Sequence, residues 1–441
     1  MSDIIKISNY IKPFRKTIKI EGDKSLSIRW ALMASQAKGK STCYNLLKSE
    51  DIISTLNCLK KLGIKVKIKK DKCEIYGNGL NSFNLKEKIT LDAGNSGTLA
   101  RLLPGLLVHS KKKIIIKGDQ SLSKRDFYRI VKPLEKFGAS LKTKKGKLPM
   151  TIEGTKFPKP ITYFEKKGSA QCKSCIMFAA LNTKGTTTIK AKKSRDHSEL
   201  LFKYLNLPIK VIKTKKHDII KLNGKKKVRP FNYRIPSDIS SSAFFIVLTV
   251  LSNKSSLVIK SVNINPTRIG ILKILKKMNV NFIIKNAKVL NGEKIGDLHI
   301  FSSQSLRPIN CPTNFNTAAI DEFLLIFLIA AKANGISTFK NLSELNQKES
   351  PRLKWGSKLL NKIGIKNIIT SDSIKIFGNP NLIVKKKIVI KDFDKDHRVF
   401  MTSVIAALTF GGNWKIYDKN SIKTSFPSFL RKIKDLGAKI N

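Results

Sequence analysis

An internal repeat constrains the fold of this chain more than any other feature of its sequence. A helical stretch, a strand, a tight turn and a second strand recur six times, with successive copies 68 to 85 residues apart. In each copy the helical stretch ends at a glycine or an asparagine: Gly63, Gly138, Asn206, Asn279, Gly364 and Gly437. This spacing is longer than that of a solenoid repeat, and it predicts a small unit of two helices and about four strands. We therefore expect an α/β protein in which three such units form each of two lobes.

Length and hydrophobic content agree with several packed cores. The 441 residues predict two to three domains, and 41% of the residues are hydrophobic. The longest apolar run, Phe323–Ala331, is too short to span a bilayer, and the chain opens without a secretory signal. We expect a soluble, cytoplasmic protein.

Basic residues greatly outnumber acidic ones, 86 against 30, which gives a net charge of +56. One interpretation is a nucleic-acid-binding protein whose lysines neutralise phosphates. However, the lysines occur in scattered groups such as Lys111–Lys113 and Lys385–Lys387, and only 8% of the residues are aromatic. We favour compositional drift, since nucleic-acid-binding proteins usually cluster their charge on one face. A positive cleft would still suit a small anionic substrate.

The cysteines suggest neither a disulfide framework nor a metal site. There are six in a long chain, and Cys172 and Cys175 form a lone CxxC within an apolar helical run. A zinc site would need a second pair or a nearby histidine. We expect buried thiols on one face of a helix.

The stretch Leu91–Pro104 has the pattern of a helix that begins at an anion site. Gly94 and Gly97 flank short polar residues, and an apolar helical run follows them. Free N–H groups at a helix start attract anions, although the same residues also occur in ordinary helix caps. Polar residues precede apolar helical runs at Asp23 and Asp396 as well. Within each lobe we expect such helix starts to point the same way and to create a positive cleft between the lobes.

Nine short motifs then make a family resemblance specific. In chain order they are GDKSLSIR (22–29), GNSGTLARLL (94–103), GDQSLSKR (118–125), GSAQCKS (168–174), SRDHSE (194–199), IDEF (320–323), KESPRL (348–353), DHRVFM (396–401) and TSFP (424–427). Together they resemble the 3-phosphoshikimate 1-carboxyvinyltransferase (EPSP synthase) family of enolpyruvyl transferases, in the family's order and from end to end of the chain.

The resemblance implies an architecture and a reaction. The family fold is two-lobed, with six βαβαββ units, three per lobe, as an inside-out α/β barrel. Lobe one would comprise residues 1–22 and 237–441, and lobe two residues 23–236, with the active site in the cleft between them. The reaction transfers the enolpyruvyl group of phosphoenolpyruvate to the 5-hydroxyl of shikimate 3-phosphate and releases phosphate. The resemblance also implies no metal or cofactor, a monomer, no nucleic-acid or membrane partner, and inhibition by glyphosate.

Site residues carry over by matching the motifs. Asp321 matches the general base, and Glu349 matches the group that protonates and deprotonates the methylene carbon, with Lys24 assisting. The residues that match the shikimate 3-phosphate site are Lys24, Ser25, Arg29, Ser169, Ala170, Gln171, Arg195, Asp321 and Lys348. The residues that match the phosphoenolpyruvate site are Lys24, Asn95, Gly97, Arg125, Gln171, Arg352 and Arg398. The paired N–H donors of an arginine guanidinium match the oxygens of phosphates and carboxylates, so arginines are expected at such sites.

Simpler interpretations remain beside these assignments. Asp321 and Glu322 could form the acidic first turn of an apolar helix, and Ser350-Pro351 has the pattern of an N-cap followed by a first helical proline. The histidines of the two DH pairs, His197 and His397, are expected to be structural.

The motifs also depart from the family pattern. Pro351 stands where the family usually has Asp, so we expect Arg352 to lack an orienting carboxylate there. Thr424 stands where some members have a substrate-binding lysine, and Lys423 lies one residue early. The related UDP-N-acetylglucosamine enolpyruvyl transferase is the alternative enzyme, but the reactive cysteine that it would carry is missing between Lys111 and Arg129.

Overall fold

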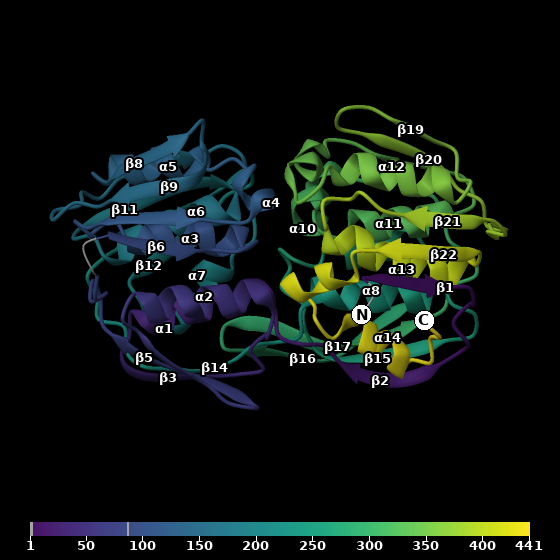
Figure 1. The fold of residues 1–441 in the computed structure, drawn as a ribbon, viewed down its shortest axis with the longest axis horizontal. Coiled ribbons are helices and arrows are strands. Elements are labelled where there is room, and N and C mark those ends of the chain that lie inside the picture. Colours follow the sequence, from purple (N-terminus) through teal and green to yellow (C-terminus); the bar gives the residue numbers. More distant parts are fainter. Residues whose placement is uncertain (1–2, 86–87) are drawn as a thin grey trace. The chain divides into compact units, whose positions relative to one another are not determined.

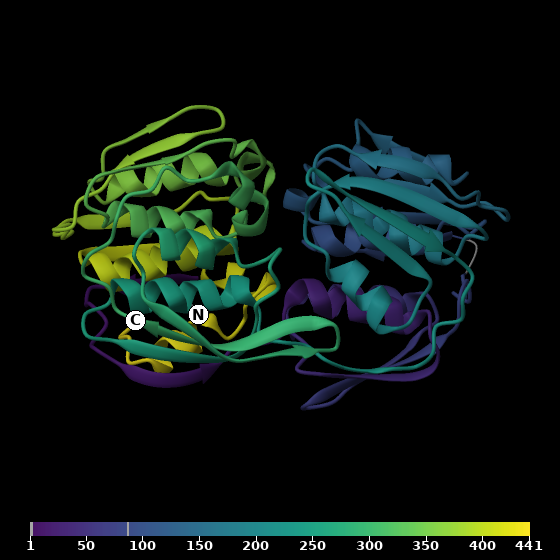
Figure 2. The ribbon, with the colours of Figure 1, turned by 180° about the vertical axis from the view of Figure 1, so that it is seen from behind.

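A computed structural model describes residues 3–85 and 88–441 of the chain (Figures 1 and 2). Its contacts divide the chain into two units, and each is described by itself. Unit 1 comprises Met1–Glu21, Pro236–Lys288 and Lys294–Asn441, and unit 2 comprises Gly22–Ile235 and Val289–Glu293. Each unit has its own hydrophobic core.

Unit 2 has buried helices at its centre and sheets around them. The central helices are α1 (Lys24–Ser35), α3 (Gly97–Leu106) and α6 (Ala170–Leu181). More peripheral helices are α2 (Glu50–Lys61), α5 (Tyr128–Lys136) and α7 (His197–Tyr204).

The sheets of unit 2 repeat one strand order, in which a parallel pair is followed by an antiparallel hairpin. The first sheet is β14 (Asn232–Arg234), β3 (Lys38–Tyr44), β5 (Lys72–Asn78) and β4 (Lys65–Ile68). The second is β6 (Lys88–Asp92), β7 (Lys113–Lys117), β9 (Lys147–Glu153) and β8 (Ser140–Lys144). The third is β10 (Thr162–Glu165), β11 (Thr186–Lys192), β13 (His217–Asn223) and β12 (Ile209–Lys213).

Unit 1 also has central helices with sheets around them, but two of its sheets have three strands. Its central helices are α8 (Ile239–Leu251), α11 (Phe323–Ala331) and α13 (His397–Phe410), and outer helices are α9 (Gly270–Lys277), α12 (Arg352–Lys362) and α14 (Phe429–Asp435). One sheet is β16 (Phe282–Leu290), β17 (Glu293–Phe301), β15 (Ser256–Asn263) and β2 (Arg15–Lys19). The others are β18 (Ile336–Phe339), β20 (Ile374–Phe377) and β19 (Asn367–Ile369), and β1 (Ile4–Ile7), β22 (Asn413–Tyr417) and β21 (Lys387–Ile390).

The composition of the central helices explains why they lie inside the sheets. Every residue of α11, FLLIFLIAA, is apolar and buried. A helix that is apolar all round must be covered on all sides, so it cannot lie on a surface. In Figure 1, α8, α11 and α13 are stacked within unit 1, and they contact one another. The predicted α/β fold of repeated units is confirmed.

The repeat positions chosen from the sequence share one backbone conformation. After the second helix of each repeat, the chain turns through a left-handed residue at Gly63, Gly138, Asn206, Asn279, Gly364 and Gly437, with φ between 53° and 103°. Glycine and asparagine tolerate this conformation, which ends helices by satisfying their last carbonyl groups. The local turn chemistry therefore recurs in both units.

A helix begins at both places where the simpler interpretations put a helix start, but one or two residues later than they predict. Helix α11 begins at Phe323 with Glu322 at its N-cap, so Asp321 and Glu322 do not form its first turn. Helix α12 begins at Arg352 with Pro351 at the N-cap, one residue later than the Ser350-Pro351 pattern predicts. Ser350 instead turns its hydroxyl toward Asp396, at 2.9 Å from Oδ2.

Candidate functional site

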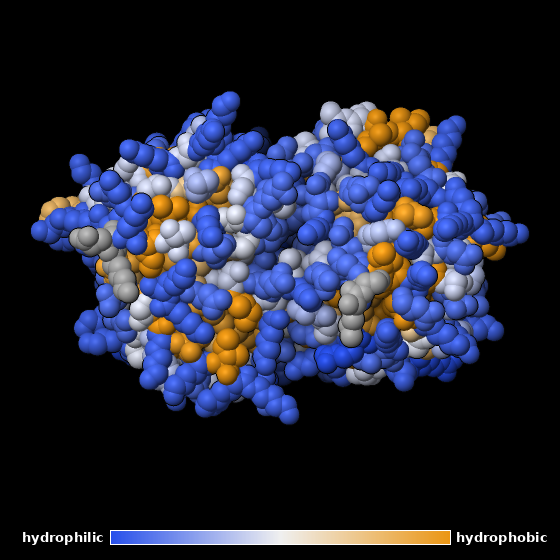
Figure 3. Space-filling view, viewed as in Figure 1, coloured by the Kyte–Doolittle hydropathy of each residue, from blue (hydrophilic) through white to orange (hydrophobic). Residues whose placement is uncertain are grey.

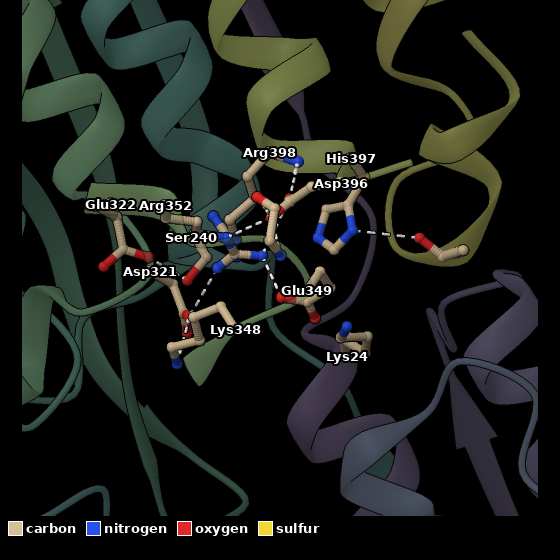
Figure 4. Close-up of polar contacts among 12 residues, drawn as sticks. Lys24, Ser240, Asp321, Glu322, Lys348, Glu349, Arg352, Asp396, His397 and Arg398 are labelled. Carbon is tan, nitrogen blue, oxygen red and sulfur yellow. Dashed lines mark hydrogen bonds and ion pairs between the residues drawn. The ribbon is translucent and has the colours of Figure 1, made fainter. Parts of the chain in front are cut away.

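The charged centre of unit 1 is the guanidinium of Arg352, which lies at the start of α12. Its Nε donates to Asp396 Oδ2 at 2.8 Å, and its Nη2 donates to Asp396 Oδ1 at 3.2 Å. Nη2 also pairs with Glu349, and Nη1 lies 3.5 Å from Asp321 Oδ1. Figure 4 shows these carboxylates turned toward the guanidinium, although they come from separate segments of unit 1.

The buried charges of this centre stabilise one another in their ionised forms. Burial disfavours the cation, but Asp396, Glu349 and Asp321 outweigh that effect and raise the pKa of Arg352. Burial also opposes ionisation of Asp396, yet the Arg352 cation holds the pKa of that carboxyl below its ordinary value. Both groups therefore stay charged at neutral pH.

Asp321 and Glu349 keep partial access to solvent, which a catalytic carboxylate requires. Their side chains are 16% and 14% exposed, whereas that of Asp396 is fully buried. Lys348 Nζ lies 3.2 Å from Asp321 Oδ1, so Asp321 contacts two cations. The structure thus brings together Asp321, Lys348, Glu349 and Arg352, as the motifs predict for neighbours in one site.

The expectation that Arg352 lacks an orienting carboxylate is wrong. Pro351 carries no charge, but Asp396 holds the guanidinium from the start of α13. Asp396 is the N-cap of that helix and also accepts the backbone N–H of Arg398 at 2.9 Å. One carboxylate therefore caps α13 and orients Arg352.

Arg398 lies on the first turn of α13 and offers a second guanidinium in unit 1. Its Nη1 is buried and makes no hydrogen bond to any residue in the described part of the chain. The guanidinium carbon is 6.0 Å from the centre of the Phe244 ring. Beside it, His397 Nδ1 lies 3.3 Å from the Thr424 hydroxyl (Figure 4 draws this contact).

In unit 2, Lys24 stands at the first position of α1. Asp23 caps this helix by accepting the Leu26 N–H at 3.0 Å. Lys24 Nζ pairs with Asp51 Oδ2 at 3.0 Å, and its side chain is 23% exposed. Ser25 follows it and is half-buried. The helix start thus presents an ammonium group that Asp51 orients.

Arg29, one turn further along α1, is buried and held by hydroxyl groups. Its Nε donates to Ser198 Oγ at 2.9 Å and its Nη2 donates to Ser174 Oγ at 3.0 Å. Its Nη1 donates to the Ser25 carbonyl at 3.0 Å. Ser174 belongs to α6 and Ser198 to α7, so Arg29 ties the helices of unit 2 together at the start of α1.

The start of α3 gathers Asn95, Gly97 and Arg125. Arg125 Nη2 donates to Asn95 Oδ1 at 3.2 Å, and Asn95 Nδ2 donates to Asp119 Oδ2 at 2.7 Å. A methyl group built on Gly97 would lie 3.0 Å from Arg125 Nη1. Gly97 thus leaves room for a guanidinium beside the helix start, where the backbone N–H groups also attract anions.

Helix α6 adds the remaining predicted residues of unit 2. Ser169 is its N-cap and accepts the Cys172 N–H at 3.2 Å, and Ala170 is its first residue. Gln171 donates to Thr98 Oγ1 at 3.1 Å, which joins α6 to α3. Arg195 lies apart from these in sequence, just before Asp196 and the start of α7, and it is half-buried.

Arg101 is a residue of this region that the motif matching missed. It is buried, donates to Gln171 Oε1 at 2.9 Å and to the Asp126 carbonyl at 3.2 Å, and stacks on the Phe127 ring. A methyl group on Gly97 would lie 2.9 Å from Arg101 Nη1. The sequence did contain a signal for Arg101, because it is the one charged residue within the apolar helical run 99–106.

The six cysteines are buried, as the sequence analysis expects for Cys172 and Cys175. Cys172 and Cys175 are buried thiols on α6, and burial raises the pKa of Cys172 to about 12. Among the described residues, no group of three or more His, Cys, Asp or Glu side chains is placed to hold a metal ion. No described helix has the length and apolar character needed to cross a membrane. The visible face of each unit is mostly hydrophilic, with small hydrophobic patches (Figure 3).

Comparisons with known proteins agree over nearly the whole chain. The family model of EPSP synthase (3-phosphoshikimate 1-carboxyvinyltransferase) matches residues 9–433. The 3-phosphoshikimate 1-carboxyvinyltransferase of Ruthia magnifica is 39% identical over 426 residues, covering 96% of both chains. That of Petrotoga mobilis is 36% identical over 417 residues, covering 93% of this chain and 94% of the relative.

A solved structure supports the same assignment. EPSP synthase from Acinetobacter baumannii has a TM-score of 0.87 at 33% identity, covering 99% of both chains. The enolpyruvyl transferase NikO from Streptomyces tendae shares the fold, with a TM-score of 0.77 at 13% identity. These findings do not favour the nucleic-acid-binding alternative or the UDP-N-acetylglucosamine enolpyruvyl transferase. The chain belongs to the EPSP synthase (3-phosphoshikimate 1-carboxyvinyltransferase) family.

Proposed function

We propose that this protein transfers the enolpyruvyl group of phosphoenolpyruvate to the 5-hydroxyl of shikimate 3-phosphate, with Asp321 and Glu349 as its acid–base pair. The observation that carries this assignment of roles is their shared contact with Arg352. Two partly exposed carboxylates flank one buried cation, so an anionic substrate bound at Arg352 would lie beside both. In acid–base catalysis, the catalytic carboxylate must first lie within hydrogen-bonding distance of the proton that it transfers, and its pKa matters only then.

The addition step assigns one proton to each carboxylate. The 5-hydroxyl oxygen bonds to the phosphate-bearing carbon of phosphoenolpyruvate, and Asp321 takes the hydroxyl proton. Protonated Glu349 gives its proton to the methylene carbon, which becomes a methyl group, and Lys24 assists this transfer. The product of this step is a tetrahedral intermediate that still carries both phosphates.

The elimination step restores the double bond. Glu349 takes a proton back from the methyl group while the carbon–oxygen bond to phosphate breaks. Phosphate leaves with that oxygen, and the Asp321 proton returns to solvent or to the leaving group. The protein groups end in their starting states, so the cycle balances.

Both substrates are anions, and we assign their binding to cations of both units. Lys348 and Asp321 would hold shikimate 3-phosphate from unit 1, and Arg352 and Arg398 would hold phosphoenolpyruvate. In unit 2, the shikimate 3-phosphate residues would be Lys24, Ser25, Arg29, Ser169, Ala170, Gln171 and Arg195. The phosphoenolpyruvate residues there would be Lys24, Asn95, Gly97, Arg125 and Gln171. The buried Nη1 of Arg398, without a hydrogen bond to the described residues, supports an anion site on α13.

We further propose that the protein is a cytoplasmic monomer and is inhibited by glyphosate in competition with phosphoenolpyruvate. Purified protein tests the acceptor assignment by phosphate release from phosphoenolpyruvate with shikimate 3-phosphate, shikimate or UDP-N-acetylglucosamine. We expect release with shikimate 3-phosphate and little with shikimate, because the 3-phosphate supplies much of the binding energy. Release with UDP-N-acetylglucosamine instead would overturn the assignment.

A further inference from the structure

A buried polar network in unit 1 lies behind Asp321, on residues with no role in the substrate assignments. We infer that Arg268 and Ser240 position the proposed general base Asp321 by holding its neighbour, Glu322. The inference rests on the proposed function and adds positioning residues to it. Arg268 and Ser240 are buried, and Ser240 contacts Glu322, so both would act on Asp321 through Glu322.

The network begins at Arg268, which precedes α9. Its Nη2 donates to Ser240 Oγ at 2.8 Å and to Asp238 Oδ1 at 3.2 Å. Asp238 is the N-cap of α8 and accepts the Ser240 N–H at 2.8 Å. A buried guanidinium therefore holds both a carboxylate and a hydroxyl at the start of α8, which leaves the hydroxyl hydrogen free to point elsewhere.

That hydrogen is donated to Glu322. The Ser240 hydroxyl donates a hydrogen bond to Glu322 Oε1, and Figure 4 shows the two side chains next to each other. Glu322 is 1% exposed and forms the N-cap of α11, directly after Asp321. Because adjacent residues share a peptide plane, anchoring Glu322 restricts the backbone of Asp321.

A second contact restrains the same turn from the other side. A methyl group built on Gly270 would lie 2.6 Å from the carbonyl carbon of Ala318 and 2.6 Å from the N atom of Ala319. The start of α9 therefore lies directly against the backbone of α10 (Asn316–Ala319), which ends just before Asp321. Arg268 and Gly270, two residues apart, thus restrain the Asp321 turn through a side chain and through backbone packing.

A similar arrangement occurs around Arg352. Arg352 is the first residue of α12, and Arg268 lies two residues before α9. Each pairs with the N-cap carboxylate of a central helix, Asp396 for Arg352 and Asp238 for Arg268. Arg352 also reaches the partly exposed Asp321 and Glu349, whereas Arg268 joins the buried Ser240 and, through it, Glu322. These two arginines thus serve the site in two ways, Arg352 within it and Arg268 behind it.

The test replaces Ser240 by alanine, with Ser242→Ala as the matched control. Ser242 is equally buried on α8, but its hydroxyl donates to the Asp238 carbonyl within the helix and not to Glu322. We expect Ser240→Ala to lower kcat about ten- to a hundredfold, the size of effect that a slight misplacement of a catalytic group has, with little change in KM for phosphoenolpyruvate. Ser242→Ala should turn over at a rate near that of wild type.

The decisive measurement adds Asp321→Asn to both variants. If Ser240 acts through Asp321, Ser240→Ala should cause no further loss of kcat in the Asp321→Asn protein, because the group that it positions has already gone. An equal loss in both backgrounds, or equal kcat for Ser240→Ala and Ser242→Ala, would overturn the inference. A wild type that fails to turn over these substrates would instead refute the proposed function.

If thermal unfolding shows that Ser240→Ala is poorly folded, variants of Glu322 provide an independent test of the inference. Glu322→Gln keeps an oxygen that accepts the Ser240 hydroxyl, whereas Glu322→Ala removes it. If Glu322 transmits the effect of Ser240 to Asp321, kcat should be lower in Glu322→Ala than in Glu322→Gln. Equal kcat in these two variants would contradict it.

Discussion

Asp396 holds Arg352 in a fork, with Nε to Oδ2 at 2.8 Å and Nη2 to Oδ1 at 3.2 Å. The two residues are 44 positions apart in the chain and belong to different repeats of unit 1. The pair replaces the charge that Pro351 cannot supply. A forked guanidinium–carboxylate pair also fixes the plane of the guanidinium, which a single contact does not.

This pair gives the stability of the fold a defined pH dependence. The pKa of Asp396 is below its ordinary value in the folded state, so its ionised form stabilises the fold at any pH above its unfolded pKa of about 3.9. That contribution is lost as the pH falls through the folded-state pKa. Asp396→Asn should therefore lower the free energy of unfolding by about 3 kcal/mol at pH 7. Urea titrations should show this difference shrinking below about pH 4.

Asp435→Asn is the control for that experiment, because Asp435 is exposed at the end of α14. Its free energy of unfolding should stay close to that of wild type at each pH. A constant difference between wild type and Asp396→Asn across the pH series would show that the charge of Asp396 does not stabilise the fold.

The acid–base roles predict different defects for Asp321 and Glu349. Asp321→Asn and Glu349→Gln should each lower kcat by about 10²–10⁴, the usual contribution of a positioned acid or base, without unfolding the protein. In deuterated water, wild type should exchange the methylene hydrogens of phosphoenolpyruvate during turnover, and Glu349→Gln should lose this exchange. Mass spectrometry of recovered substrate measures it. Near-normal turnover in both variants would remove these residues from the mechanism.

Gly97→Ala should discriminate between substrate and inhibitor. The added methyl would lie 2.9 Å from Arg101 Nη1 and 3.0 Å from Arg125 Nη1, so both guanidinium groups must shift. The ends of flexible side chains can move at low cost, which should leave the fold intact. Crowding should weaken glyphosate, the longer ligand, by about ten- to a hundredfold and phosphoenolpyruvate by less. Inhibition and Michaelis constants measure both effects, and equal changes would contradict this prediction.

Binding of shikimate 3-phosphate should draw the two units together. The proposed site takes cations from both units, and a bound anion would offset the repulsion between them. The radius of gyration from X-ray scattering should decrease with shikimate 3-phosphate and not with shikimate at the same concentration. An unchanged radius at saturating ligand would exclude this form of closure.

The repeat made much of the fold predictable from sequence. The helix-ending residues such as Gly63 and Asn206 are signalled by local chemistry, because left-handed turns favour these residue types. Uniformly apolar runs such as Phe323–Ala331 likewise indicate central helices. Local signals of this kind do not depend on how distant parts of the chain pack.

Long-range polar pairs were not predictable in the same way. Nothing near Arg352 in sequence indicates that Asp396 will hold it, and nothing near Glu322 indicates Ser240 or Arg268. These partners are set by how the repeats pack against one another. Pro351 shows the consequence, since comparing this position with the family pattern suggested a missing carboxylate that Asp396 of the next repeat supplies.

The origin of the oxygen in the released phosphate distinguishes enolpyruvyl transfer from attack at phosphorus. Phosphoenolpyruvate labelled with oxygen-18 in the bridge between carbon and phosphorus is incubated with the protein and shikimate 3-phosphate. If the protein transfers the enolpyruvyl group, the released phosphate should retain the label. It should appear in a one-to-one ratio with enolpyruvylated product and only when shikimate 3-phosphate is present. Unlabelled phosphate, which requires attack at phosphorus, or release without the acceptor would contradict enolpyruvyl transfer by this protein.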